Sequence, residues 1–332
     1  MPILLFRTLL SALVLLAGSP VAFAIDTARP DVKQFIDRMV EEHAYDRAKL
    51  ESVLAGAESK SSIIDAISKP AEGTLEWHQY RKIFLTDERI EAGAIFWKDN
   101  EADLARISEG TGVPIEILVG IIGVETYFGR ITGSYRVLDA LATLAFDYPP
   151  RSKFFSGELE QFLLLVREEG MNATDATGSY AGAMGRPQFM PSSYRAYAVD
   201  STDDGKRDIW ENWADVIGSI ANYFVRHGWQ TGKDIVAPAT LGAQWQGATP
   251  ENTLTPKETV TSLSHQGVMF STGLGGDEKS QLITLKDEDG EQHWVGFHNF
   301  FVITRYNRSV MYALAVHQLG QEIALEVSGR ES

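Results

Sequence analysis

The sequence predicts an α+β protein that is mainly α-helical, and three observations predict this class. Apolar residues recur at helical spacing over residues 30–100 and 111–232. Between residues 231 and 299, proline, glycine and threonine become frequent, and short stretches alternate apolar with polar side chains. Residues 309–325 return to helical spacing, so we expect a small β-rich part within a helical protein.

The first 24 residues are typical of a secretory signal. Arg7 stands just before an apolar run over residues 9–17, and Ala22-Phe23-Ala24 ends the stretch in the A-x-A-like pattern of a cleavage site. The alternative is a membrane anchor, but the run is shorter than the roughly 20 residues that a span needs. The chain has no cysteine that could carry a lipid. We therefore expect export to the periplasm, cleavage after Ala24, and no membrane anchor in the mature chain.

Charge and cysteine usage exclude several classes of function. The formal net charge of the 332 residues is −15, and loss of Arg7 with the signal makes it −16. Nucleic acid is therefore not an expected partner, because its phosphates would be repelled. The absence of cysteine excludes disulfides and thiolate chemistry.

The chain after the signal divides first into two helical parts. Residues 25–100 are expected to form an N-terminal helical domain, with a second helix in it over residues 83–97. Residues 101–230 are expected to form a catalytic core. Its most informative stretch, 111–232, holds four helix-like segments separated by turns rich in glycine and proline.

The second half of the chain predicts a hairpin and a returning helix. Residues 231–300 are expected to form a small β-rich domain. In it, residues 280–285 and 292–297 flank the turn 287–290, which contains a glycine. The C-terminal segment, 301–332, is expected to return as a helix to the core or the helical domain.

Glu125 is the strongest catalytic candidate. Ile121 and Ile122 lie four and three residues before it, so helical spacing places its carboxyl group on or beside an apolar stripe. Desolvation raises the pKa of a carboxyl group in such a place, and glycosidic-bond cleavage needs a protonated acid. The alternative is an ion pair with Arg130 or Arg136 at the end of the helix.

Residues 179–194 form a second candidate region, dense in small, amide and aromatic residues. Glycines let the backbone approach a ligand closely. Ser179 and Gln188 can hydrogen-bond the hydroxyl and acetamido groups of a sugar, and the tyrosines offer faces for sugar rings. The alternative is a glycine-rich turn between two helices.

Several motifs together resemble those of the lytic murein transglycosylase B family. They are Gly123-Val124-Glu125-Thr126-Tyr127-Phe128-Gly129, the run 179–194, Ala221-Asn222-Tyr223-Phe224 and Thr304-Arg305-Tyr306-Asn307-Arg308-Ser309. The resemblance covers roughly residues 30–322 and, without a cysteine for a lipid, points to the soluble branch. It implies a lysozyme-like core flanked by the helical domain and the small β domain.

The resemblance also implies roles for particular residues. Glu125 would be the single catalytic acid, and Ser179 and Gln188 would contact the substrate. The tyrosines expected along the groove are Tyr80, Tyr223 and Tyr306. One departure is Arg186-Pro187 before Gln188, where a smaller or aromatic pair is expected in some relatives.

The implied reaction acts on peptidoglycan glycan strands without water. Glu125 would protonate the oxygen of the β-1,4 bond between N-acetylmuramic acid and N-acetylglucosamine, and the muramic acetamido oxygen would stabilise the cationic centre. As a carboxylate, Glu125 would then deprotonate the sugar's own 6-hydroxyl, giving a 1,6-anhydro end. No organic cofactor is expected, and the spacing of Asp139 and Asp147 singles out neither as a second carboxylate.

Two other functions fit the same residues. A hydrolytic muramidase would cleave the same bond and leave a reducing sugar. A non-catalytic peptidoglycan-binding protein would use the same groove without cleavage. The sequence identifies no protein partner.

Residues 200–211 are typical of an EF-hand calcium loop. Oxygen ligands fall at the positions such a loop uses, and Gly205 permits its sharp turn. The side-chain ligands are Asp200, Thr202, Asp204, Asp208 and Glu211, and Lys206 offers its backbone carbonyl. The longer loop of the resembling family makes Asp215 an alternative last ligand. We expect a structural Ca²⁺; the alternative is an acidic surface loop stabilised by Arg207.

Overall fold

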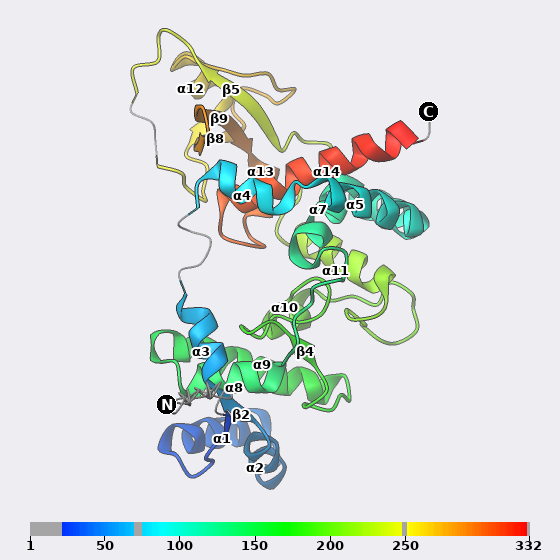
Figure 1. Cartoon of the computed structure of the whole chain (residues 1–332), viewed down its shortest axis with the longest axis vertical. Helices are drawn as coiled ribbons and strands as arrows, with labels where there is room; N and C mark the ends of the chain where they lie inside the picture. Colours follow the sequence, from blue (N-terminus) through cyan, green and yellow to red (C-terminus); the bar gives the residue numbers. More distant parts are fainter. Residues whose placement is uncertain (1–21, 70–74, 248–250, 331–332) are drawn as a thin grey trace, which may run out of the picture.

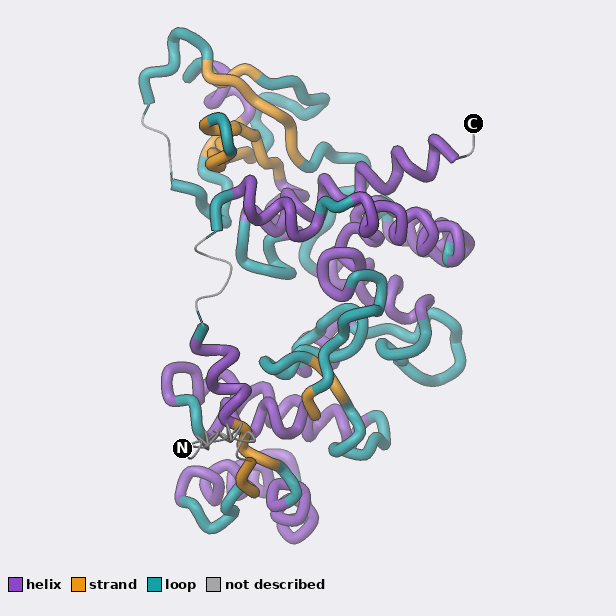
Figure 2. The backbone as a smooth tube through the Cα atoms, viewed as in Figure 1, coloured by secondary structure: helices purple, strands orange, loops and turns teal. Residues whose placement is uncertain are grey.

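The computed structural model describes residues 22–69, 75–247 and 251–330, and helices dominate it (Figure 1 and Figure 2). Residues 1–21 of the predicted signal lie outside the described residues. Its last three residues, Ala22–Ala24, form strand β1, which pairs antiparallel with β2 (Glu58–Lys60).

The N-terminal helices form one end of the molecule, at the bottom of Figure 1. These helices and the two on which they lie are α1 (Pro30–His43), α2 (Arg47–Ala55), α3 (Ser61–Ser68), α8 (Val137–Phe146) and α9 (Ser152–Glu168). Pro30 occupies the first turn of α1, where its missing N–H leaves no hydrogen bond unmade. The Asp46 side chain accepts from the Lys49 N–H and caps α2.

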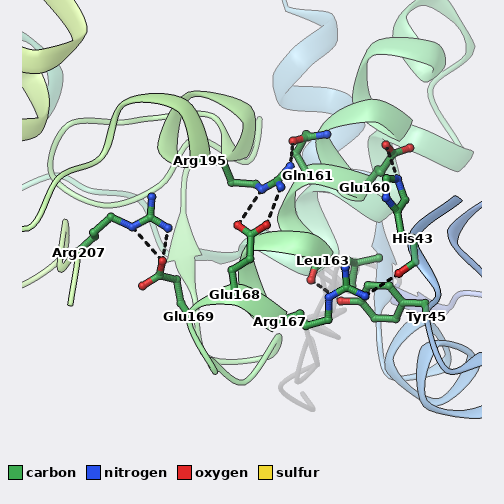
Figure 3. Close-up of polar contacts among 10 residues, drawn as sticks. All are labelled: His43, Tyr45, Glu160, Gln161, Leu163, Arg167, Glu168, Glu169, Arg195 and Arg207. Carbon is green, nitrogen blue, oxygen red and sulfur yellow. Dashed lines mark hydrogen bonds and ion pairs between the residues drawn. The ribbon is translucent and has the colours of Figure 1, made fainter. Parts of the chain in front are cut away.

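Polar contacts from α9 attach the N-terminal helices (Figure 3). Glu160 pairs with His43 of α1 at 3.0 Å, and Arg167 donates to the His43 carbonyl at 2.8 Å. The Tyr45 hydroxyl donates to the Leu163 carbonyl. The end of α1 is therefore held to α9 by the side chains of Glu160 and Arg167 from α9 and by that of Tyr45, which follows α1.

The remaining long helices form the opposite half of the helical part. They are α4 (Trp77–Phe84), α5 (Asp87–Asp99), α6 (Glu101–Thr111), α7 (Ile115–Thr126), α11 (Trp213–Arg226) and α14 (Val310–Arg330). A single helix was expected over residues 83–97, but α4 ends at Phe84. The Thr86 side chain then accepts from the Arg89 N–H and starts α5 anew. The first helices, α1 to α3, thus lie by α8 and α9, whereas α4 and α5 lie by α14.

Glycines bring α7 and α14 unusually close together. A Cβ atom added to Gly120 of α7 would lie 2.4 Å from the Val316 carbonyl oxygen of α14. A Cβ added to Gly320 of α14 would lie 2.1 Å from the Glu116 carbonyl oxygen of α7. Because no side chain fits at either point, the two helix backbones touch directly.

The β-rich part is one antiparallel sheet of five strands in the order β6-β8-β9-β5-β7. Its elements, with two short helices beside it, are β5 (Val236–Leu241), β6 (Glu258–Thr259), α12 (Val260–His265), β7 (Val268–Met269), β8 (Lys279–Asp287), β9 (Gly290–Phe297) and α13 (His298–Ile303). Asp287 pairs with Gly290 across the turn, and Gly290 has a φ of 135°. The predicted hairpin is therefore confirmed, with strands a little longer than expected.

Short elements complete the fold between α7 and α11. They are β3 (Tyr135–Arg136), the 3-10 helix η2 (Pro149–Arg151), β4 (Thr177–Gly178) and α10 (Pro191–Tyr197). Residues 111–232 thus contain five α-helices rather than the four expected, the short α10 being the additional one.

Within the described ranges, no single helix is long and apolar enough to cross a membrane. The pair α6 and α7 passes such a test only when its two helices are taken together, and they bend by 118°.

The first prediction concerns the contact between α7 and α14. Gly320→Ala is expected to destabilise the protein by about 1–3 kcal/mol, because its methyl group meets a backbone carbonyl that cannot rotate away. The measurement is urea unfolding followed by circular dichroism. Gly157→Ala in α9 is the matched control, since a Cβ there meets nothing within 4 Å. An equal loss of stability in both variants would contradict the prediction.

Candidate active site

Glu125 lies in the last turn of α7, where the helix leaves the core. Ile121 and Ile122 are fully buried, whereas Glu125 is half-buried. The next residues, Tyr127 and Phe128, have φ values of 49° and 57°, in the left-handed region that side chains disfavour. Two consecutive residues of this kind are a local strain, and strain of this kind clusters at functional sites.

Tyr312 of α14 binds the carboxyl group of Glu125. Its hydroxyl donates to Glu125 Oε1 at 2.5 Å, and its side chain is only 2% exposed. Burial, followed by the charge of Glu125, raises the pKa of Tyr312 well above its ordinary value. The hydroxyl therefore stays protonated and remains a donor to Glu125 throughout the physiological pH range.

The three tyrosines expected along the groove are largely buried. Tyr80 of α4 is 2% exposed, stacks on Trp77, and lies near enough to Tyr312 to help raise its pKa. The Tyr306 ring centroid lies 4.8 Å from that of Tyr223. Burial, and then the charge of Glu125, raises the pKa of Tyr306, which places Tyr306 beside the catalytic candidate.

The hydroxyls of Tyr223 and Tyr306 are used within the protein. Tyr306 Oη donates to the Pro187 carbonyl at 2.7 Å, and Tyr223 Oη donates to the Arg305 carbonyl at 2.6 Å. Burial raises the pKa of Tyr223 as well. Both tyrosines thus fasten the segments that surround Glu125.

Gln188 sits at the tip of a tight turn, residues 184–189, called the Gln188 turn below. Backbone bonds of 2.8 and 3.1 Å between Met184 and Phe189 close the turn. Gln188 itself has a φ of 53°, and its Nε2 donates to the carbonyls of Gly185 and Thr132 at 2.8 and 3.0 Å. These contacts fix the orientation of its amide.

Ser179 lies beside the same turn, directly after β4. Its Oγ accepts from the N–H of Ala183 at 3.1 Å. A Cβ added to Gly133 would lie 2.2 Å from the Gly178 oxygen, so the segment after α7 runs directly against the residue before Ser179. Thr126 Oγ1 donates to the Arg186 carbonyl at 3.2 Å, which ties the end of α7 to the Gln188 turn.

The alternative partners of Glu125 have other roles. The Arg130 guanidinium lies 4.8 Å from the Tyr127 ring centroid, and Arg136 pairs with Asp139 at 3.0 Å. Asp139 is fully buried, and Lys60 also binds it at 2.9 Å. Asp147 pairs with Arg29 at 2.6 Å. Asp139 and Asp147 therefore hold the N-terminal segments to α8.

The acidic loop, residues 200–211, folds around its first aspartate. Asp200 accepts from the backbone N–H groups of Thr202, Asp204 and Gly205 at 2.7 to 3.3 Å. Asp215, in the first turn of α11, is fully buried. Its two carboxylate oxygens accept from the backbone N–H groups at positions 201 and 208 at 2.7 and 2.9 Å.

The loop positions expected as ligands do not all face one point. The Glu211 side chain is 82% exposed and turns to Arg186, at 3.2 Å. Asp208 Oδ1 accepts from the N–H groups of Trp210 and Glu211. Across the described residues, no three acidic or histidine side chains converge as a preformed metal cluster. Burial, with the charges of Asp200 and Asp204, raises the pKa of Asp215, so negative charge is concentrated here.

Sequence reasoning missed Tyr312, the residue that contacts Glu125. Tyr312 is buried in α14 together with Ala315, Val316 and Leu319, and such a position is typical of a core residue. The Oη–Oε1 contact joins residues 187 positions apart in the chain. A periodic pattern records which face is buried, but it does not record which residue lies opposite.

Comparisons with known proteins agree with this geometry. A model of the family described as transglycosylase SLT domain matches residues 27–321. The chain is 43% identical over 305 residues to membrane-bound lytic murein transglycosylase B of Escherichia coli (strain K12), covering 89% of this chain and 83% of that protein. The soluble lytic transglycosylase SltB1 of Pseudomonas aeruginosa is 47% identical, with a TM-score of 0.86 over 91% of this chain and 100% of that chain.

A third similar protein has been solved with bound ligands. Escherichia coli Slt35 in complex with calcium is 43% identical, with a TM-score of 0.82 over 91% of this chain and 96% of that chain. Slt35 has also been solved in complex with bulgecin A. The expected α+β fold with a lysozyme-like core is confirmed by these relatives. This chain belongs to the transglycosylase SLT domain family, among the lytic transglycosylases.

Proposed function

We propose that this chain cleaves the β-1,4 bond between N-acetylmuramic acid and N-acetylglucosamine in peptidoglycan, with Glu125 as acid and then base. One observation carries the assignment. Glu125 is a half-buried carboxyl group at the end of a buried apolar helix, and the Tyr312 hydroxyl holds one of its oxygens at 2.5 Å. This bond restricts the rotation of the carboxyl group, as proton transfer to a bound glycan strand requires.

The reaction balances without water. The Glu125 proton moves to the glycosidic oxygen, the bond from that oxygen to C1 of N-acetylmuramic acid breaks, and the acetamido oxygen stabilises the cationic C1. The 6-hydroxyl of the same sugar then attacks C1 and gives its proton to the Glu125 carboxylate. The products are an N-acetylglucosamine end and a 1,6-anhydromuramic acid end, and Glu125 is protonated again. One carboxyl group suffices because the nucleophile belongs to the substrate.

Substrate contacts come from the residues around Glu125. Gln188 Nε2 is engaged with two backbone carbonyls, which leaves its amide oxygen to accept from a sugar hydroxyl or acetamido N–H. Ser179 lies on the adjoining segment and offers its hydroxyl. Tyr306 lies near Glu125 and packs on Tyr223, and Tyr80 lies near Tyr312, so aromatic rings help to keep the surroundings of the carboxyl group apolar.

The place of action follows from the substrate. Peptidoglycan strands lie outside the cytoplasmic membrane, and the first 24 residues have the pattern of a secretory signal. We propose that the chain is exported to the periplasm and acts there as a released protein.

The acidic loop fits a structural calcium ion. Asp200, Thr202 and Asp204 supply oxygen atoms within one turn, with the Lys206 carbonyl next in the chain, and such a set suits Ca²⁺. Asp215 is the better last ligand, because its carboxylate already binds the loop backbone at positions 201 and 208, whereas Glu211 is engaged with Arg186. Burial, and to a smaller extent the charges of Asp200 and Asp204, raise the pKa of Asp215, and a bound cation would offset the effect of those charges.

The test of the function is the product of digestion. Wild-type protein is expected to release muropeptides from purified sacculi that are one water molecule lighter than reducing muropeptides, as mass spectrometry would record. Glu125→Gln should lower the rate by at least about 100-fold, because the amide donates no proton to the leaving oxygen. Reducing ends from the wild type would instead identify a hydrolase. Binding without release would identify a binding protein.

A second prediction concerns the pH dependence. Tyr312→Phe removes a donor that favours the charged form of Glu125, so the protonated acid should persist to higher pH. The alkaline limb of the pH–rate profile is therefore expected to move to higher pH, with a lower maximal rate. Tyr45→Phe is the control, since Tyr45 donates to a backbone carbonyl between α1 and α9. An unshifted alkaline limb in Tyr312→Phe would refute this role.

A third prediction concerns calcium. Addition of CaCl₂ at about 100 times the dissociation constant should stabilise the protein by about 2.7 kcal/mol, measured as a rise in melting temperature that EDTA reverses. Asp200→Asn keeps the oxygen that accepts from Thr202 and Asp204, loses the one that accepts from Gly205, and lowers the ligand charge, so the rise should shrink. Asp203→Asn is the matched control, because Asp203 is not at a ligand position. The same rise in both variants would argue against calcium in this loop.

A further inference from the structure

Arg186 joins the Gln188 turn to the acidic loop. Its backbone N–H donates to the Ile209 carbonyl at 2.9 Å. Its guanidinium donates to the Glu211 carbonyl through Nη1 at 2.7 Å and to Glu211 Oε2 through Nη2 at 3.2 Å. Three hydrogen bonds thus connect one residue of the turn to the end of the loop.

The guanidinium is also packed. It lies 4.1 Å from the ring centroid of Trp213, the first residue of α11, and the Arg186 side chain is only 16% exposed. Trp213 in turn packs edge-on against Phe96 of α5, with centroids 4.6 Å apart. A Cβ added to Gly129 would lie 3.1 Å from Trp213 and 3.3 Å from Arg186 Nε, so the segment after α7 packs tightly against both.

The backbone of Arg186 contacts the end of α7, beside the catalytic candidate Glu125. Its carbonyl accepts from Thr126 Oγ1, and Thr126 directly follows Glu125. Gln188 is two residues further along the turn. A shift of Arg186 would therefore move the end of α7 and the amide of Gln188 together.

The acidic loop gives Arg186 a fixed support. Arg207 of the loop pairs with Glu169 at the end of α9 (Figure 3). Arg106 of α6 donates to the Ser201 carbonyl at 3.3 Å. The loop is thus anchored to two helices, and Arg186 fastens the Gln188 turn to it.

We propose that Arg186 is a positioning residue that sets the Gln188 turn against the acidic loop and so fixes the substrate-binding geometry beside Glu125. The proposal rests on the proposed function, since it takes Gln188 as a substrate contact. A planar guanidinium can donate to two oxygens while it stacks on an indole ring, which a lysine cannot reproduce.

The experiment compares Arg186→Met, Arg186→Lys and Arg195→Met. Arg195 is the matched control, because it makes a two-pronged pair with Glu168 at 2.6 and 2.9 Å, joining α10 to α9 away from the Gln188 turn (Figure 3). Initial rates on soluble glycan strands at varied concentration give KM and kcat, and the melting temperature of each variant is measured in parallel.

Arg186→Met is expected to raise KM by roughly five- to ten-fold, because misplaced contacts weaken binding, and Arg186→Lys should give an intermediate value. Arg195→Met should lower the melting temperature about as much as Arg186→Met does, and it should leave KM unchanged. A KM for Arg186→Met equal to that of Arg195→Met, in an active wild type, would overturn the proposal. A wild type that releases no anhydro product would instead overturn the proposed function.

Discussion

The direct backbone contact between α7 and α14 is the constraint on which the site depends. Glu116 lies opposite Gly320, and Gly120 lies opposite Val316. Each step of four residues along α7 is matched by four in the reverse direction along α14, so the two helices run antiparallel. One further turn along each helix brings Tyr312 level with Val124, next to Glu125, whose carboxyl group the Tyr312 hydroxyl binds. A side chain at either glycine would separate the helices and lengthen this contact.

Of the three carboxyl groups considered from the sequence, two are engaged in ion pairs that hold other segments. The other acids that could have served, Asp139 and Asp147, are bound by Lys60, Arg136 and Arg29 and attach the N-terminal segments. Around Glu125 the structure instead supplies tyrosines, whose pKa values are raised by burial and by the nearby carboxylate. These groups donate or pack, and none competes with Glu125 for a proton at physiological pH.

The local features of this site could be predicted from the sequence, and the long-range ones could not. The position of Glu125 on an apolar stripe and the hairpin around Gly290 follow from spacing alone. The break between α4 and α5 was missed because Leu85 fits the helical pattern. The local sign of the break is Thr86, whose side chain caps the start of α5. Tyr312 was missed because its role depends on the helix opposite.

The acidic loop illustrates the same limit at shorter range. The twelve-residue pattern indicated Glu211 as the last acid, and the longer loop of the resembling family made Asp215 the alternative. The contact that separates them is Arg186, which comes from another segment and engages Glu211. Asp215 remains against the loop, since both of its oxygens accept backbone N–H groups from it. The local sequence thus predicted an acidic loop, whereas the pairing of Glu211 with Arg186 depends on a segment outside the loop.

The β-rich part is inserted between α11 and α14, and its two ends lie side by side where Gln230 meets Asn299. Asn299, fully buried at the start of α13, accepts from the Gln230 N–H at 2.9 Å and donates to the Gln230 carbonyl at 2.8 Å. The chain therefore leaves the helical part and returns to it at one point. Because the entropy cost of closing a loop grows only slowly with its length, a sheet can be inserted there at modest cost. Tyr306 and Tyr312, which follow the sheet in the sequence, therefore lie near Glu125 despite the insertion.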